Sequence, residues 1–140
     1  MSKITLFIIA FMVCGTLCGQ SIFGKWKTVD DETGEQKSII EIYERDGKVF
    51  GKIVEILKQE HKNAVCVKCA GDEKNRPVLG LELIKNMEPE GRYYKKGTIF
   101  DPEHGKKYRC RLALTEDPDV LQVRGYIAFL YSTQYWLRVE

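Results

Sequence analysis

The sequence predicts an all-β fold, an antiparallel up-and-down β-barrel of about eight strands with at most one short helix near residues 80–87. Apolar and polar residues alternate along a series of short segments, as they do in half-buried strands. Turn sequences such as Asp46-Gly47 separate these segments. The chain has 140 residues, which leaves room for roughly one domain.

The N-terminus has the pattern of a secretory signal peptide, with Lys3 ahead of an apolar run and small residues after it. The run covers residues 4–13, which is shorter than the roughly 20 residues of a spanning helix. We therefore expect residues 1–19 to be removed and residues 20–140 to form one domain with no transmembrane segment. Cleavage after Cys18 and cleavage after Gly19 both fit the pattern.

The signal peptide predicts a periplasmic or secreted protein. Lipid attachment to Cys14 or Cys18 is disfavoured, because large residues, Val13 and Leu17, precede them. The net charge is only +2, with acidic and basic residues interspersed. This composition argues against a nucleic-acid partner.

The expected strands follow in order along the first half of the chain. Residues 23–29 alternate, and a polar turn separates them from a β-branched segment at 38–44. Asp46-Gly47 is a strong hairpin signal, because the turn of a tight hairpin requires positive φ. It leads into a third strand at 48–57.

Alternation stops over residues 58–77, and a loop of this length is functional or held down by other contacts. Residues 80–87 read either as a short helix or as an irregular strand. Strands are expected again at 93–100 and 106–115, around the turn from Asp101 to Gly105. Two further strands, 120–129 and one from 131 or 133 to 139, complete the pattern.

Two motifs near the ends of the mature chain are similar to a known fold. Gly24-Lys25-Trp26 resembles the Gly-x-Trp signature of lipocalins, in which an arginine near the C-terminus covers the tryptophan. Trp136-Leu137-Arg138 supplies such an arginine, and a guanidinium stacks well on an indole ring.

A longer series of motifs resembles a family of small exported bacterial proteins, domain of unknown function 2147. It includes Gly51-Lys52-Ile53, the segment from Gly97 to Tyr108, and Leu121 to Tyr126. The resemblance implies a lipocalin-like barrel and carries no established activity, substrate or catalytic residues. From these motifs and from the turn at residues 101–105, we expect structural roles for Gly24, Trp26, Asp101, Gly105, Trp136 and Arg138.

Three cysteines follow the predicted signal peptide, and we expect a local disulfide between Cys66 and Cys69 that holds the long loop. The alternatives are a redox pair, or half of a zinc site completed by Cys110, His61 and His104. We predict neither a metal nor a cofactor. Cys110 shares a strand face with apolar residues, so it is expected to be a buried thiol.

Asp101 and His104 have the spacing of an acid–base pair, but an aspartate that opens a Pro-containing turn also has a structural role. We therefore predict no catalytic residues. The aromatic residues offer either a filled barrel or a ligand cavity. The candidate ligand-binding residues are Tyr43, Tyr108, Tyr126 and Arg124.

The favoured hypothesis is a barrel that binds a small apolar or amphipathic molecule, with the long loop at its rim. The second is a filled barrel that acts through its surface as an interaction module of the cell envelope. The third is a thiol-based or acid–base enzyme. The sequence leaves the oligomeric state open.

Overall fold

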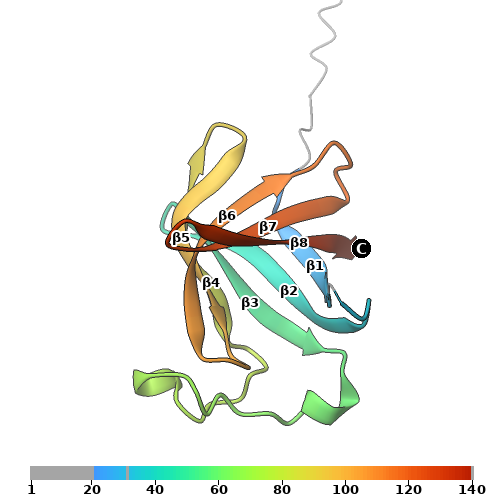
Figure 1. Ribbon diagram of the computed structural model, residues 1–140, viewed down its shortest axis with the longest axis vertical. Helices are drawn as coiled ribbons and strands as arrows, with labels where there is room; N and C mark the ends of the chain where they lie inside the picture. Colours follow the sequence, from blue (N-terminus) through green and yellow to red (C-terminus); the bar gives the residue numbers. More distant parts are fainter. Residues whose placement is uncertain (1–20, 31, 140) are drawn as a thin grey trace, which may run out of the picture.

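A computed structural model describes residues 21–30 and 32–139 (Figure 1). The predicted signal peptide lies outside the described residues. Eight antiparallel strands form a closed barrel in which neighbours in sequence are neighbours in space. They are β1 (Gly24–Val29), β2 (Gln36–Arg45), β3 (Lys48–Ile56), β4 (Glu82–Glu90), β5 (Tyr93–Asp101), β6 (Lys106–Leu114), β7 (Val120–Ile127) and β8 (Leu130–Val139). The predicted fold class is confirmed.

The sequence left residues 80–87 open between a short helix and an irregular strand, and the structure has the strand. Residues 82–87 form the first part of β4, which pairs with β3 on one side and β5 on the other. The irregular hydrophobic pattern arises because Asn86 has a positive φ of 59°. Ile84 and Met87, three positions apart, are both fully buried.

The barrel closes through a short contact between its first and last strands. Only Lys25, Trp26 and Lys27 of β1 pair with β8, opposite Val139, Arg138 and Leu137. Within the described chain, residues 130–136 of β8 therefore have β7 on one edge and no strand on the other. The barrel is closed at one end and splayed between β1 and β8 at the other.

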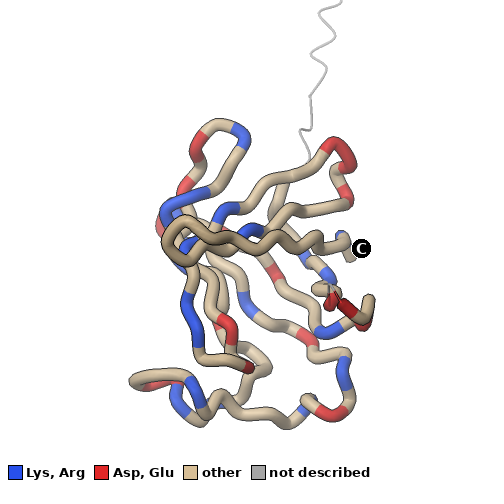
Figure 2. Tube along the Cα trace, viewed as in Figure 1, with Lys and Arg blue, Asp and Glu red and all other residues tan. Residues whose placement is uncertain are grey.

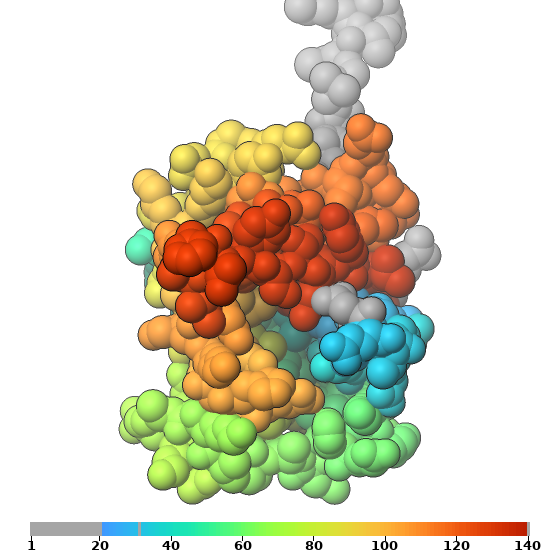
Figure 3. All heavy atoms as spheres, in the orientation of Figure 1, coloured from blue at the N-terminus to red at the C-terminus, as the bar shows by residue number. Residues whose placement is uncertain are grey.

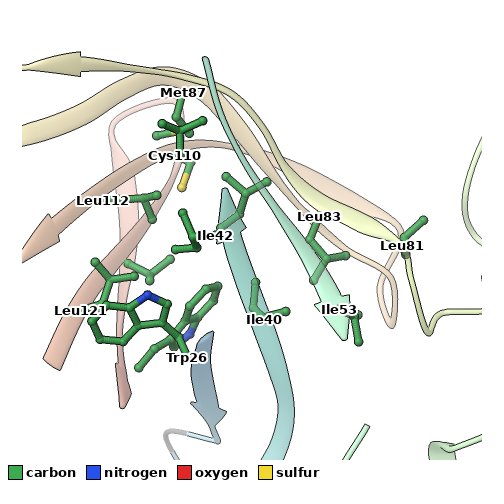
Figure 4. Packing of buried hydrophobic residues seen from close by; sticks show 14 of the residues in the cluster. Trp26, Ile40, Ile42, Ile53, Leu81, Leu83, Met87, Cys110, Leu112 and Leu121 are labelled. Carbon is green, nitrogen blue, oxygen red and sulfur yellow. The ribbon is translucent and has the colours of Figure 1, made fainter. Parts of the chain in front are cut away.

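The closed half contains the tightly packed core. Trp26, Ile42, Met87, Leu112 and Leu121 come from five different strands and are almost completely buried (Figure 4). Burying a large apolar side chain of this kind contributes roughly 1.5–3 kcal/mol to folding. This half therefore provides a rigid base for the open half.

Arg138 covers Trp26 at the closed end. Its guanidinium lies 4.3 Å from the centre of the indole ring. It also donates hydrogen bonds to the carbonyl oxygens of Ser21 (2.8 Å) and Pro118 (3.0 Å). The Trp26 indole N–H donates to the Ile22 carbonyl at 2.8 Å. The Arg138 guanidinium thus joins β8 to the segment before β1 and to the β6–β7 turn.

Candidate ligand-binding cavity

The open half of the barrel contains a cavity of about 620 Å³. In the space-filling view, a hollow lies between β8, the β5–β6 turn, the β1–β2 region and the long β3–β4 loop (Figure 3). Inward-facing apolar side chains from six strands form its inner wall: Ile40, Ile53, Leu83, Ile99, Val123 and Trp136. The volume lies within the roughly 300–1,000 Å³ typical of small-molecule sites.

Polar side chains from β1, β2, β6 and β8 interrupt the apolar wall of the cavity. Thr28 and Ser38 share a hydroxyl–hydroxyl hydrogen bond of 2.8 Å between β1 and β2. Tyr108 of β6 and Gln134 of β8 also line the cavity. The Gln134 amide oxygen accepts a hydrogen bond from the Trp136 indole N–H at 3.2 Å. An apolar molecule with one polar end suits such a lining.

Charged side chains of both signs surround the mouth. Lys37 of β2 contacts Asp30 at 3.2 Å and Glu103 of the β5–β6 turn at 4.0 Å. Glu103 also approaches the His61 imidazole, at 4.0 Å, from the long loop. Glu103 thus lies between a lysine of β2 and a histidine of the long loop. Exposed pairs of this length contribute little to stability.

The β3–β4 loop is an ordered rim that contains two short 3₁₀ turns, Gln59–His61 and Gly71–Glu73. The predicted disulfide between Cys66 and Cys69 is confirmed, and both cysteines are buried. The Cys66 backbone also forms hydrogen bonds with Arg76 (2.7 Å) and Asn75 (2.8 Å) across the loop. These contacts hold the loop in one shape beside the cavity mouth.

Gly105 is where this rim meets the β5–β6 turn. It has a φ of +66°, as expected for the glycine of a turn. A side chain there would also lie 2.8 Å from the Lys68 Cβ atom. Lys68 lies between the two cysteines of the disulfide, so the absence of a side chain at Gly105 lets the pinned loop approach the barrel closely.

Asp101 has a complete set of local partners in the same turn. One carboxylate oxygen accepts hydrogen bonds from the backbone N–H groups of Glu103 (2.9 Å) and His104 (3.3 Å). The other lies 2.7 Å from the His104 Nδ1 atom. Potential metal-ligand atoms of Asp101, Glu103 and His104 lie within 4.8 Å of one another. The Asp101 oxygens, however, are already engaged in holding the turn.

Of the four tyrosine and arginine candidates, the structure places Tyr108 in the cavity wall. Tyr43 faces outward from β2, where its hydroxyl donates a hydrogen bond to Glu82, and Arg45 pairs with the same carboxylate at 3.1 Å. Partial burial, together with this hydrogen bond, raises the pKa of Tyr43 to about 12. Tyr43 therefore joins β2 to β4 on the outside of the barrel.

Tyr126 and Arg124 also lie on the outer face, because β7 directs Val123 and Gly125 inward. The Tyr126 ring packs against Tyr131, with centroids 5.9 Å apart. The Arg124 guanidinium lies 4.4 Å from the centre of the same Tyr131 ring. Alternation assigned these two residues to one shared face, and the structure shows which face that is.

Cys110 occupies the closed half, away from the disulfide. It is a free, buried cysteine, and desolvation raises its pKa to about 12. A thiol held in this neutral form is a poor nucleophile and a poor metal ligand. With Cys66 and Cys69 oxidised, the three cysteines do not combine into one site in the described structure.

Sequence reasoning missed most of the apolar wall. Ile40, Ile53 and Val123 are ordinary strand residues, and their alternation fits a filled barrel equally well. The splay between β1 and β8 hollows this half, and it depends on pairing that no local motif encodes. Trp136 was noted as a structural residue near Arg138, and the structure also places it in the cavity wall.

The closed antiparallel barrel of eight strands defines a lipocalin-like fold. A similar solved structure is protein HP1028 from Helicobacter pylori, described as belonging to the lipocalin family. The two share 19% sequence identity at a TM-score of 0.74, over 86% of this chain and 84% of that one. The model of a family described as "Uncharacterized protein conserved in bacteria (DUF2147)" matches residues 24–138, and the chain belongs to this family.

No curated protein matches the sequence. Within residues 21–30 and 32–139, no helix has the length and apolar character needed to cross a membrane.

Proposed function

We propose that this protein binds a small molecule with an apolar body and a polar end inside the open half of its barrel. The observation that carries the proposal is the cavity of about 620 Å³ with an apolar wall and a charged mouth. A filled barrel acting only through its surface needs no such space. The proposed role is binding without chemical conversion of the ligand.

The arrangement of the lining suggests how the ligand lies. Ile40 and Trp136 are almost completely buried and would contact the apolar body. Lys37 and His61, which lie 4.0 Å from Glu103 at the mouth, would contact an acidic or hydroxylated end of the ligand. The disulfide-pinned rim would then limit access without closing the cavity.

The test uses a neutral, environment-sensitive probe, N-phenyl-1-naphthylamine, whose fluorescence rises in apolar surroundings. We expect saturable binding that quenches Trp136, a residue of the cavity wall. Val123→Phe should weaken binding about tenfold, because the added ring occupies part of the cavity. Gln122→Phe on the opposite face of the same strand is the matched control and should leave binding within about twofold.

Native mass spectrometry of the untreated protein provides an independent readout, because a tightly bound ligand appears as added mass. Unchanged probe binding by a folded Val123→Phe variant would place the probe outside the cavity and contradict the proposal. Thermal unfolding of each variant distinguishes loss of the cavity from loss of the fold.

We further propose that the protein works outside the cytoplasm. The support comes from the N-terminal sequence pattern and from the Cys66–Cys69 disulfide, a bond typical of oxidising compartments. Fractionation of bacterial cells that express the full chain tests this proposal. We expect a form shortened by about 19 residues in the periplasm or medium; an uncleaved cytoplasmic protein would contradict it.

A further inference from the structure

The β7–β8 hairpin exposes an apolar tip on the outside of the barrel. Phe129 at the turn is 89% exposed, Leu130 65% and Tyr131 61%. Ile127 on the other side of the turn is also exposed. Four apolar side chains exposed together at one turn do not stabilise a monomer in water. Such a cluster indicates a site that contacts a membrane or another protein.

Arginines surround the base of the same tip. Arg109 of β6 donates a hydrogen bond to the Ala128 carbonyl oxygen in the turn, at 3.0 Å. The Arg124 guanidinium stacks on Tyr131 at 4.4 Å and donates to the Thr133 hydroxyl at 2.9 Å. Arg111, on the next outward position of β6, lies 4.4 Å from the centre of the Tyr93 ring. Aromatic stacking holds these cations in place without neutralising them.

These three arginines lack acidic partners. Among the described residues, no carboxylate lies within 4.0 Å of Arg109, Arg111 or Arg124, whereas Lys37, Arg45 and Lys85 each have at least one. Residues 105–115 and 120–139 contain no aspartate or glutamate. In the charge view, the β7–β8 hairpin accordingly carries no acidic residue (Figure 2). The outer face of β6 and β7 therefore carries three arginines and no carboxylate, beside an exposed apolar hairpin tip.

From this combination we infer that the β7–β8 hairpin docks on an anionic phospholipid bilayer. Phe129 and Leu130 would enter the boundary between headgroups and acyl chains, where aromatic and aliphatic side chains partition favourably. Arg109 and Arg124 would contact the phosphate groups, since basic side chains beside an apolar anchor are attracted to anionic lipid. Tyr131 has the apolar ring and polar hydroxyl that suit the interface. This surface lies outside the cavity, so the inference is independent of the proposed ligand.

The experiment is co-sedimentation with vesicles, using residues 20–140. This part of the chain contains all eight strands and the closed core, and it omits the apolar segment 4–13, which would bind bilayers by itself. Vesicles of phosphatidylcholine with about one third phosphatidylglycerol should bind the protein at least tenfold more strongly than phosphatidylcholine alone. The difference should shrink as salt is added.

Two double variants separate the apolar from the electrostatic contribution. Phe129→Ser with Leu130→Ser, and Arg109→Gln with Arg124→Gln, should each lower partitioning about tenfold or more. The matched controls are Val67→Ser with Leu79→Ser, exposed apolar residues of the long loop, and Lys25→Gln with Lys27→Gln on the outer face of β1. Each control should remain within about twofold of the unsubstituted protein.

Three results would overturn the inference. The first is failure of the unsubstituted protein to bind the anionic vesicles. The second is binding that both hairpin variants retain although they are folded by circular dichroism. The third is a dimer in sedimentation velocity that Phe129→Ser with Leu130→Ser abolishes, because the free edge of β8 and its apolar tip would then be an interface between two copies.

Discussion

Gly97 is the position at which the barrel tolerates a side chain least. It lies in β5 opposite Cys110, facing the core where β4 passes close by. A Cβ atom there would lie 2.7 Å from the Met87 backbone nitrogen and would overlap the Lys85 carbonyl oxygen and the Met87 sulfur. Two of these three atoms belong to the backbone of β4, so a change of rotamer cannot relieve the overlap.

We therefore expect Gly97→Ala to lower the free energy of unfolding by about 3 kcal/mol, at the upper end of the cost of overpacking. Met87 is fully buried, so its sulfur has no solvent to move into. Equilibrium unfolding in urea, followed by tryptophan fluorescence, measures the change, because Trp26 and Trp136 are both buried in the barrel.

Gly125→Ala is the matched control. It faces the cavity from β7, and its nearest neighbour would be the Tyr108 Cβ atom at 3.4 Å, an ordinary contact. Removing the glycine also reduces the entropy of the unfolded chain, which offsets small losses. We expect a change below about 1 kcal/mol. Equal costs for the two variants would refute the account of close β4–β5 packing.

Three further outcomes follow from the described contacts. Because burial raises the pKa of Cys110 to about 12, residues 20–140 in the native state should not react with a thiol reagent at pH 8. In denaturant they should expose one reactive thiol, because Cys66 and Cys69 are joined in a disulfide. Rapid reaction in the native state would contradict the burial. Arg138→Lys should lower the free energy of unfolding by about 2 kcal/mol, because lysine cannot both stack on Trp26 and reach two carbonyls. Arg92→Lys is the control, because Arg92 is exposed where it contacts Tyr93, and it should change the free energy of unfolding by less than about 0.5 kcal/mol. Urea unfolding distinguishes the two variants. Hydrogen bonds from the Thr33 and Glu32 backbone, followed by Lys37, lower the pKa of Asp30 from 3.8 to about 2. The stabilisation that the Asp30 carboxylate provides is therefore present above pH 3.8 and lost as the pH falls towards 2. Asp30→Ala should reduce the thermal midpoint at pH 6 and have little effect near pH 2. An equal effect at both pH values would show that ionisation of this carboxylate does not stabilise the fold.

The barrel was predictable from the sequence because turns and strand alternation, which define its strands, are local patterns. Asp46-Gly47 fixes one hairpin, and Asp46 and Gly47 both have the positive φ that such a turn requires. The alternation of Tyr108, Cys110 and Leu112 with arginines indicated one inward and one outward face. Strand β4 was ambiguous because a positive φ at Asn86 shifts the alternation in the middle of the strand.

The site was predictable only in part, because its residues meet through long-range pairing. The disulfide joins cysteines three positions apart and was expected on that ground. The cavity instead depends on the short β1–β8 contact, which involves opposite ends of the chain. Tyr126 and Arg124 lie outside for the same reason: the closing register of the barrel, rather than the composition of β7, decides which face is interior.

Strand β8 shows how one barrel accommodates both stability and exposed function. Its C-terminal part carries Arg138 and pairs with β1 over the packed core. Its N-terminal part has a free edge, contributes Gln134 and Trp136 to the cavity, and ends at the exposed Leu130. If the pairing with β1 continued along the whole strand, the barrel would close over the mouth and the free edge would be covered. The early divergence of β1 and β8 therefore creates both the cavity mouth and the free edge. The packed core of the closed half stabilises the barrel and so offsets the strand pairing that is missing at the open end.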